Sequence, residues 1–114
     1  MGFKEDNPFE KRLNESKRII EKHRSRVPII IEKNKNSIIT DIDKNKYLVP
    51  NDLTMNQFIY IVRKRLKLKS SESIFLLVNN QLCPSNEVFS EIYEKHSDKD
   101  GFLYIIYTTE NTFG

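Results

Sequence analysis

The stretch that decides the fold lies near the C-terminus and reads Asp100-Gly101-Phe102-Leu103-Tyr104-Ile105-Ile106-Tyr107. Asp100-Gly101 is a turn signal, because glycine adopts positive φ angles without a Cβ clash. The six residues that follow are all apolar or aromatic. A strand with one wet face would alternate polar and apolar residues, so this unbroken run predicts a strand buried on both faces. We therefore expect this last strand at the centre of a sheet, with a layer packed on each side.

Length and composition predict one globular domain. The chain has 114 residues, of which 38% are hydrophobic and 31% charged, which is typical of a soluble protein with a modest core. No apolar run approaches the roughly 20 residues that span a bilayer, and no signal-peptide pattern opens the chain. Cys83 is the single cysteine. It cannot form an internal disulfide, which favours a reducing compartment such as the cytosol or the nucleus.

The charge of the chain is unevenly placed. The net charge is +3, and residues 1–26 hold eight basic and five acidic side chains, while the remainder holds eleven of each. This excess is far from the dense basic face of a nucleic-acid-binding protein, so we expect no nucleic-acid partner. A second basic cluster, Arg63–Lys69, falls at the end of a predicted helix, where the helix dipole favours cations.

A helix is predicted before the first strand. Asn7 suits the N-cap, Pro8 suits the first helical position, and Glu10 lies three residues after the cap, where its side chain can reach back. We expect the helix to end at about Lys22–Arg24. Its apolar residues are few, so it should lie on another layer rather than form a core itself; they are Phe9, Leu13, Ile19 and Ile20.

Two further stretches predict the first pair of strands. Val27–Ile31 is an almost unbroken β-branched run and predicts another strand buried on both faces. Residues 32–37 are charged and rich in asparagine, which predicts a loop or hairpin turn, and residues 38–43 have no regular pattern. Lys46–Pro50 begins with a charge and ends with a proline, as edge strands do.

The second half of the chain predicts a long helix, a strand and a short helix. Thr54–Gln57 is a capping box. The helix it opens has one apolar face, made by Met55, Phe58, Ile59, Val62 and Leu66. Ser73–Val78 predicts a strand, and Ser85 is a plausible N-cap for the short helix. The inward residues of that helix are expected to be Val88, Phe89, Ile92 and Tyr93.

The predicted order is helix, strand, strand, helix, strand, short helix, strand. Without the first helix this is the β-grasp layout, in which the first and last strands are parallel neighbours at the centre of the sheet. Both central strands are predicted to be buried on two faces, so the N-terminal helix should cover the face that a bare β-grasp leaves wet. The predicted class is α+β, with a four-stranded mixed sheet. Residues 1–25 form the helical extension, 26–108 the body and 109–114 a tail.

Six blocks of the sequence, in order and at matching spacing, resemble the autophagy ubiquitin-like modifiers of the GABARAP type. The blocks are Pro8–Arg12, Arg26–Ile30, Lys46–Pro50, Phe75–Asn79, Asp98–Tyr104 and Glu110–Gly114. The resemblance covers nearly the whole chain. It implies a ubiquitin-like fold and a flexible C-terminal conjugation tail. The departures are small: Ile31 and Cys83 occupy positions where other residues are common, and Thr108-Thr109 stands where Ser-Gly is frequent.

The resemblance implies that the protein is a conjugated modifier rather than an enzyme. Gly114 would be joined to the amine of phosphatidylethanolamine, with Phe113 as the handle beside it. The residue suits the chemistry, because glycine has no side chain to obstruct attack on its activated carboxylate. The implied partners are ubiquitin-like activating and conjugating enzymes, and a cysteine protease that processes and delipidates the protein. No cofactor, metal or catalytic residue is implied.

The resemblance also implies a groove for peptides of the pattern aromatic-x-x-aliphatic. An exposed edge strand such as Lys46–Pro50 can add an extended peptide by main-chain hydrogen bonds. By position, the pocket for the aromatic residue comprises Glu15, Ile19, Pro28, Lys46, Leu48 and Phe102. The pocket for the aliphatic residue comprises Tyr47, Val49, Pro50, Leu53, Phe58, Ile61 and Val62. Acidic residues flanking the peptide could pair with Arg26, Lys44, Lys46 and Arg65.

The implied setting is the cytoplasm and, after conjugation, the autophagosome or another vesicle membrane, where the protein would recruit cargo receptors and autophagy machinery. An alternative is an unconjugated adaptor in vesicle trafficking or on the cytoskeleton. Tyr47, Leu48 and Val49 could also be plain sheet core, because side chains on an edge strand can point inward. Cys83 has no apparent acid–base partner that would make it a nucleophile. His23 and His96 are distant from each other and make no recognisable metal site.

Overall fold

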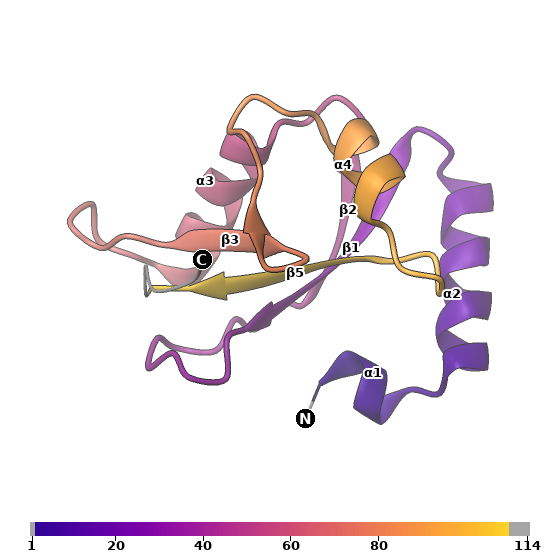
Figure 1. Ribbon diagram of the computed structural model, residues 1–114, viewed down its shortest axis with the longest axis horizontal. Coiled ribbons are helices and arrows are strands. Elements are labelled where there is room, and N and C mark those ends of the chain that lie inside the picture. The colour runs from indigo at the N-terminus through magenta and orange to yellow at the C-terminus, as the bar shows by residue number, and fades with distance from the viewer. Residues whose placement is uncertain (1, 110–114) are drawn as a thin grey trace.

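The computed structural model describes residues 2–109. Its elements follow in the order α1 (Phe3–Asp6), α2 (Phe9–Lys22), β1 (Arg26–Lys33), β2 (Lys46–Pro50), α3 (Met55–Leu66), β3 (Phe75–Val78), β4 (Gln81–Leu82), α4 (Phe89–His96) and β5 (Leu103–Thr108). The sheet order is β2-β1-β5-β3-β4, with β1 and β5 parallel and the other neighbours antiparallel (Figure 1). The predicted α+β class, the central parallel pair and the edge position of β2 are confirmed.

The sheet has five strands, so the prediction of four was wrong. The fifth, β4, pairs with the end of β3 after a tight turn at Asn79 and Asn80. Both asparagines have positive φ, of 51° and 63°, as the favoured two-residue hairpin turn requires. Because β4 is only two residues long and both are exposed, it has no hydrophobic pattern that would have predicted it.

Helices cover both faces of the sheet. Figure 1 shows α3 and α4 above the sheet, α1 below it and α2 upright at one side. Ile29 and Ile31 of β1 belong to the core under α3 and α4, while Ile30 packs with Phe3 on the opposite face. Burial of β1 on two faces is therefore confirmed. In β5 it holds only in part, because Tyr104 and Ile106 are half-buried.

The second face is covered by two helices, and sequence reasoning expected only one. The short helix α1 was missed, yet it supplies Phe3, which is 6% exposed. From α2, Ile19 packs against the same cluster. Phe9, expected to lie on the layer beneath, is 43% exposed. An isolated aromatic residue in a charged N-terminal stretch gives no periodic signal, which is why the contribution of α1 was not predicted.

The capping predictions were right at one helix and wrong at two. At α3 the capping box is confirmed, with Gln57 N donating to Thr54 Oγ1 at 3.2 Å and Thr54 N to Gln57 Oε1 at 2.9 Å. At α2 the N-cap is Pro8, and the Asn7 side chain instead donates to the Phe3 carbonyl, closing α1. At α4 the N-cap is Val88. Ser85 was expected there, but it lies in the turn before α4, where Glu87 N donates to Pro84 O at 3.1 Å.

Candidate functional site: an open strand edge between two helices

Strand β2 is the outermost strand at one side of the described sheet. The backbone hydrogen-bonding groups of its successive residues point alternately towards β1 and away from it. Ile31 N donates to Asn45 O at 2.8 Å. In an antiparallel pair hydrogen-bonded and non-hydrogen-bonded positions alternate. The register pairs Lys46 with Ile30 and Leu48 with Pro28, so Lys46 and Leu48 direct their backbone amides and carbonyls away from β1. These groups form the edge to which another strand could add.

One acceptor on this edge is already in use. Arg26 lies opposite Pro50 at the start of β1, and its Nη1 donates to the Leu48 carbonyl at 3.2 Å. Both side chain and contact are exposed. A strand that adds to β2 at Leu48 must therefore displace the Arg26 guanidinium.

The side chains of β2 point to opposite faces of the sheet in turn. Tyr47 and Val49 belong to, or pack against, the core under α3. Lys46 and Leu48 face the other way, since successive side chains of a strand alternate. The two predicted groups of pocket residues thus lie on opposite faces of one edge, the first towards α2 and the second towards α3. Pro50 is the exception. It is predicted with the second group, but it lies on the same face of β2 as Lys46 and Leu48.

The residues predicted to hold an aromatic side chain come together in the structure. Lys46 Nζ lies 2.6 Å from Glu15 Oε2 of α2. Ile19, one turn further along α2, packs against the cluster that contains Phe102. Pro28 is buried and Phe102 is 1% exposed, whereas Leu48 is half-buried. The more accessible members are thus Glu15, Ile19, Lys46 and Leu48.

Phe3 is a residue of this region that sequence reasoning missed. Its ring lies 5.4 Å from the Phe102 ring, edge to face, and 6.4 Å from that of Tyr104. Lys46 Nζ lies 5.1 Å from the Phe3 ring centroid. Phe3 N donates to Glu32 Oε2 at 2.7 Å, which fixes α1 to β1. Phe3 therefore contacts two of the predicted pocket residues and forms a side wall of the region.

The residues predicted to hold an aliphatic side chain divide by depth. Val49, Phe58 and Val62 are buried in the main core and lie beneath the surface, as the plain-core interpretation of Val49 anticipated. Tyr47 packs edge to face on Phe58 with ring centroids 5.4 Å apart. Leu53 is half-buried. The exposed members are Pro50 and Ile61, the latter 37% exposed.

The Tyr47 hydroxyl is a buried polar atom with no hydrogen-bond partner among residues 2–109. The pKa of this phenol is raised above its ordinary value, mainly by burial, although the nearby Arg65 acts in the opposite direction. Lys44 Nζ lies 4.9 Å from the ring centroid. The phenol therefore stays neutral at physiological pH and keeps an unused donor at the side of β2 that faces α3.

The four predicted basic residues all lie around the edge, and each already has a partner; that of Lys44 is the Tyr47 ring. Lys46 pairs with Glu15, and Arg26 donates to the Leu48 carbonyl. Arg65 Nε lies 2.7 Å from Asp43 Oδ1. The hydrogen bond from Arg65 lowers the pKa of Asp43, and the same bond raises the pKa of Arg65. An acidic peptide would therefore exchange with existing contacts rather than meet unused cations.

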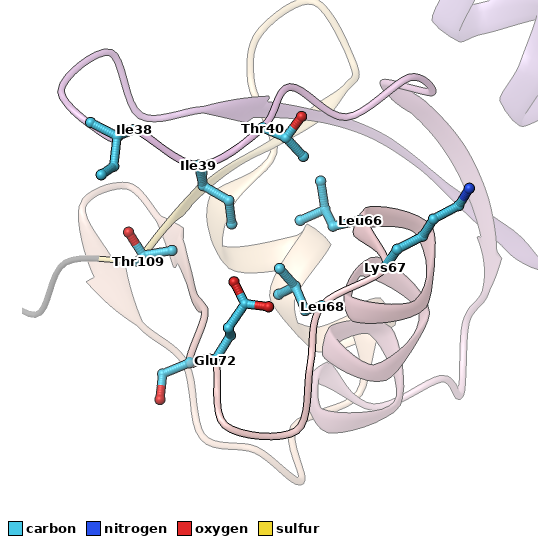
Figure 2. Close-up of a pocket in the computed structure, with 9 residues that line it drawn as sticks. Ile38, Ile39, Thr40, Leu66, Lys67, Leu68, Glu72 and Thr109 are labelled. Carbon is cyan, nitrogen blue, oxygen red and sulfur yellow. The ribbon is translucent and has the colours of Figure 1, made fainter.

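A separate open hollow of about 520 Å³ lies between the loop that joins β1 to β2 and the C-terminal end of α3 (Figure 2). Its walls are Ile38, Ile39, Thr40, Leu66, Lys67, Leu68, Glu72, Ser73 and Thr109. None of the predicted site residues lines it. We place the candidate peptide site at β2 because an edge strand binds through its backbone and shallow pockets, and needs no deep cavity.

The remaining candidates make no second site within residues 2–109. No group of three His, Cys, Asp or Glu side chains in this part of the chain could hold a metal ion. His96 Nδ1 lies 3.0 Å from Asn79 Nδ2. Burial, with the nearby Glu87, raises the pKa of the Cys83 thiol, which disfavours the reactive thiolate. Phe113 and Gly114 lie outside the described residues. None of the described helices is long and apolar enough to span a bilayer.

A β-grasp sheet with added N-terminal helices, and with β2 at an outer edge, defines a ubiquitin-like protein. The sequence matches the family described as "Autophagy protein Atg8 ubiquitin like" over residues 11–114, and the chain belongs to that family.

The relatives support this over almost the whole chain. Autophagy-related protein 8 of Kluyveromyces lactis is 54% identical over 113 residues, which are 99% of this chain and 91% of the relative. The proteins of the same name from Candida albicans and Cochliobolus heterostrophus are 55% and 54% identical, over 98% of this chain and 83% and 94% of theirs.

Proposed function

We propose that this protein is an autophagy modifier that acts by being attached to membranes and by binding peptides, and that it catalyses no reaction itself. The carboxylate of Gly114 is joined to the amine of phosphatidylethanolamine. Its β2 edge binds aromatic-x-x-aliphatic peptides of cargo receptors and autophagy machinery. Activating and conjugating enzymes and a processing protease act on it, and it moves between the cytoplasm and autophagic membranes. Membership of the Atg8 family supports the proposal.

The observation that carries the peptide-binding part is the arrangement of the two pocket groups on opposite faces of β2. In an extended peptide, residues three positions apart point to opposite faces, because side chains alternate with a period of two. A peptide that adds to the edge would direct its aromatic residue towards α2 and its aliphatic residue towards α3. The three-residue spacing of the motif fits this arrangement, whereas a spacing of two or four would not.

A titration with a Trp-x-x-Leu peptide carrying acidic flanks tests the groove. We expect a Kd of roughly micromolar order, as for a short peptide that must become ordered on binding. The matched peptide with both anchors changed to Ala should not bind at these concentrations. A second control peptide, Trp-x-Leu, keeps both anchors but places them on one face, and it should bind at least about tenfold more weakly. Equal binding of the three peptides would refute the groove.

The conjugation part has its own test. Gly114→Ala leaves the β2 edge unchanged, so we expect peptide binding to persist while attachment to membranes is lost. The alternative, an unconjugated adaptor in trafficking or on the cytoskeleton, predicts that Gly114→Ala has no effect on membrane attachment. Conjugation reconstituted with the enzymes of a related organism and phosphatidylethanolamine vesicles would separate the two.

A further inference from the structure

The turn before β5 holds a buried carboxylate. Asp100 is 0% exposed. Its Oδ1 accepts the Phe102 amide at 2.8 Å, and its Oδ2 accepts Arg12 Nη1 at 2.6 Å and the Tyr104 hydroxyl. A buried charge is costly unless it is paired and hydrogen-bonded. Asp100 meets that requirement only while Arg12, on α2, stays in place.

The same turn contacts α2 at a second point. Ser16, which is 1% exposed, donates through Oγ to the Asp100 carbonyl. The next residue, Gly101, has a φ of 93°, and a Cβ added there would lie 2.3 Å from Ser16 Oγ. The turn therefore fits against α2 without room for a side chain. Because Arg12 and Ser16 are four residues apart, they lie on one face of the helix.

That face of α2 also leads to the aromatic pocket. Glu15 and Ile19 lie three residues after Arg12 and Ser16 respectively, a rise of about 4.5 Å. The apolar cluster that holds the N-terminal helices is small, with Phe3, Ile30 and Phe102 as its buried members. Apolar packing alone thus restrains α2 weakly, and a shift of α2 against the turn would move Glu15 and Ile19 relative to Phe102. The residues of the aliphatic pocket come from β2, α3 and the segment between them, which this shift would leave in place.

We propose that Asp100, with Arg12 and Ser16, positions the aromatic pocket. The cluster holds α2 at the separation from β1 and β5 that admits the aromatic side chain of a peptide, and it sets the affinity for that side chain without touching it. This inference rests on the peptide-binding function proposed above. It assigns to the Asp98–Gly101 turn a role in ligand recognition, although the turn lies outside the β2 edge.

Asp100→Asn tests the proposal. It keeps the shape of the side chain and an oxygen that can accept the Phe102 amide, but it removes the charge that pairs with Arg12. NMR titrations would use the Trp-x-x-Leu peptide and its two single-anchor Ala versions. We expect the full peptide to bind about tenfold more weakly to the variant. In the variant, the affinity lost when the Trp of the peptide is replaced with Ala should shrink by a similar factor. The affinity lost when the Leu is replaced with Ala should stay the same.

Asp41→Asn is the matched control. Asp41 lies outside this turn, its side chain is 83% exposed and it pairs with Lys33 at 3.4 Å, so its variant should leave unchanged the affinity lost on removing either anchor. We call the affinity lost on replacing either anchor with Ala its anchor penalty. If both anchor penalties shrink equally in Asp100→Asn, the variant has lost structure generally and the proposal is overturned. No change in either penalty would overturn it too.

Tyr104→Phe covers the case in which Asp100→Asn does not fold. It removes one hydrogen bond to Asp100 but keeps the ring on Phe3 and Phe102. We expect the same selective effect on the Trp anchor, of about threefold; unchanged anchor penalties would refute the inference. If the wild type itself fails to bind the full peptide, the proposed groove fails and this inference fails with it. If the wild type binds and the variants keep both penalties, only the positioning role is wrong.

Discussion

The two faces of the sheet are held by different means. Sixteen buried residues form the core under α3 and α4, whereas three form the cluster under α1 and α2. On the second face a buried ion pair, Arg12 with Asp100, and a close fit of Ser16 against the turn supplement the apolar contacts. The first face therefore carries most of the stability, through apolar burial. The second depends on a few directional contacts, which makes it the face that is easier to shift.

The largest effect is expected on the α3 face. Phe58 is 0% exposed, with Tyr47 and Phe89 rings 5.4 and 5.3 Å away. Phe58→Ala leaves a cavity in this core and should reduce the free energy of unfolding by about 3–5 kcal/mol. Urea unfolding followed by circular dichroism measures the loss. Tyr60→Ala, on the same helix but 60% exposed, is the control and should change little. A loss as small as that of the control would remove the distinction between the two faces.

A smaller effect is expected at the equivalent aromatic residue of the other face. Phe3→Ala should reduce the free energy of unfolding by about 1.5–3 kcal/mol. The burial of the Phe3 ring is lost, but α1 is a helix of only four residues and can detach locally instead of leaving a rigid cavity. Hydrogen exchange should show the amides near α1 opening without global unfolding. Phe9→Ala, at a partly exposed position of α2, serves as the comparison, and a loss matching that of Phe58→Ala would contradict this account.

The smallest effect concerns the surface ion pair near α3, Asp43 with Arg65. The pKa of Asp43 is lowered, first by the hydrogen bond from Arg65. A lowered folded-state pKa means that the stabilisation is complete above the ordinary Asp value near 3.9, and is lost only as the pH falls through the lower folded value. Carboxyl ¹³C shifts of Asp43 should therefore titrate below the ordinary value, and Arg65→Gln should restore it. An unshifted midpoint in the wild type would show that the pair does not persist in solution.

The central strands could be predicted from the sequence because their signals are local and strong. Val27–Ile31 and Phe102–Tyr107 are unbroken apolar runs. The capping box predicted at Thr54–Gln57 is confirmed by its two hydrogen bonds. The elements that were missed give no such signal. β4 has two exposed residues, and α1 is a single turn whose only apolar residue is Phe3. Their positions are decided by contacts with residues far away in the sequence.

The candidate site was predictable in part for the same reason. The proline and the charge at the ends of Lys46–Pro50 identified an edge strand, but the depth of each side chain follows from packing. Val49, Phe58 and Val62 lie in the core, and Phe102 lies beneath Phe3. The pairing of Arg12 with Asp100 joins residues 88 positions apart, and no spacing rule relates them. Sequence reasoning thus identified the edge and its neighbours, but not the contacts that hold α2 beside it.

The parallel pairing of β1 with β5 has a consequence for synthesis of the protein. Ile29 pairs with Leu103 and Lys33 with Tyr107, so the middle of the sheet joins a strand that is made before β2, α3, β3, β4 and α4 to a strand that is made after them. A nascent chain on the ribosome cannot close this pair until β5 has emerged. Only five residues separate Thr108 from Gly114. A chain that carries the proposed attachment point therefore already contains its last central strand. A chain that terminates before β5 lacks both and would not compete for conjugation.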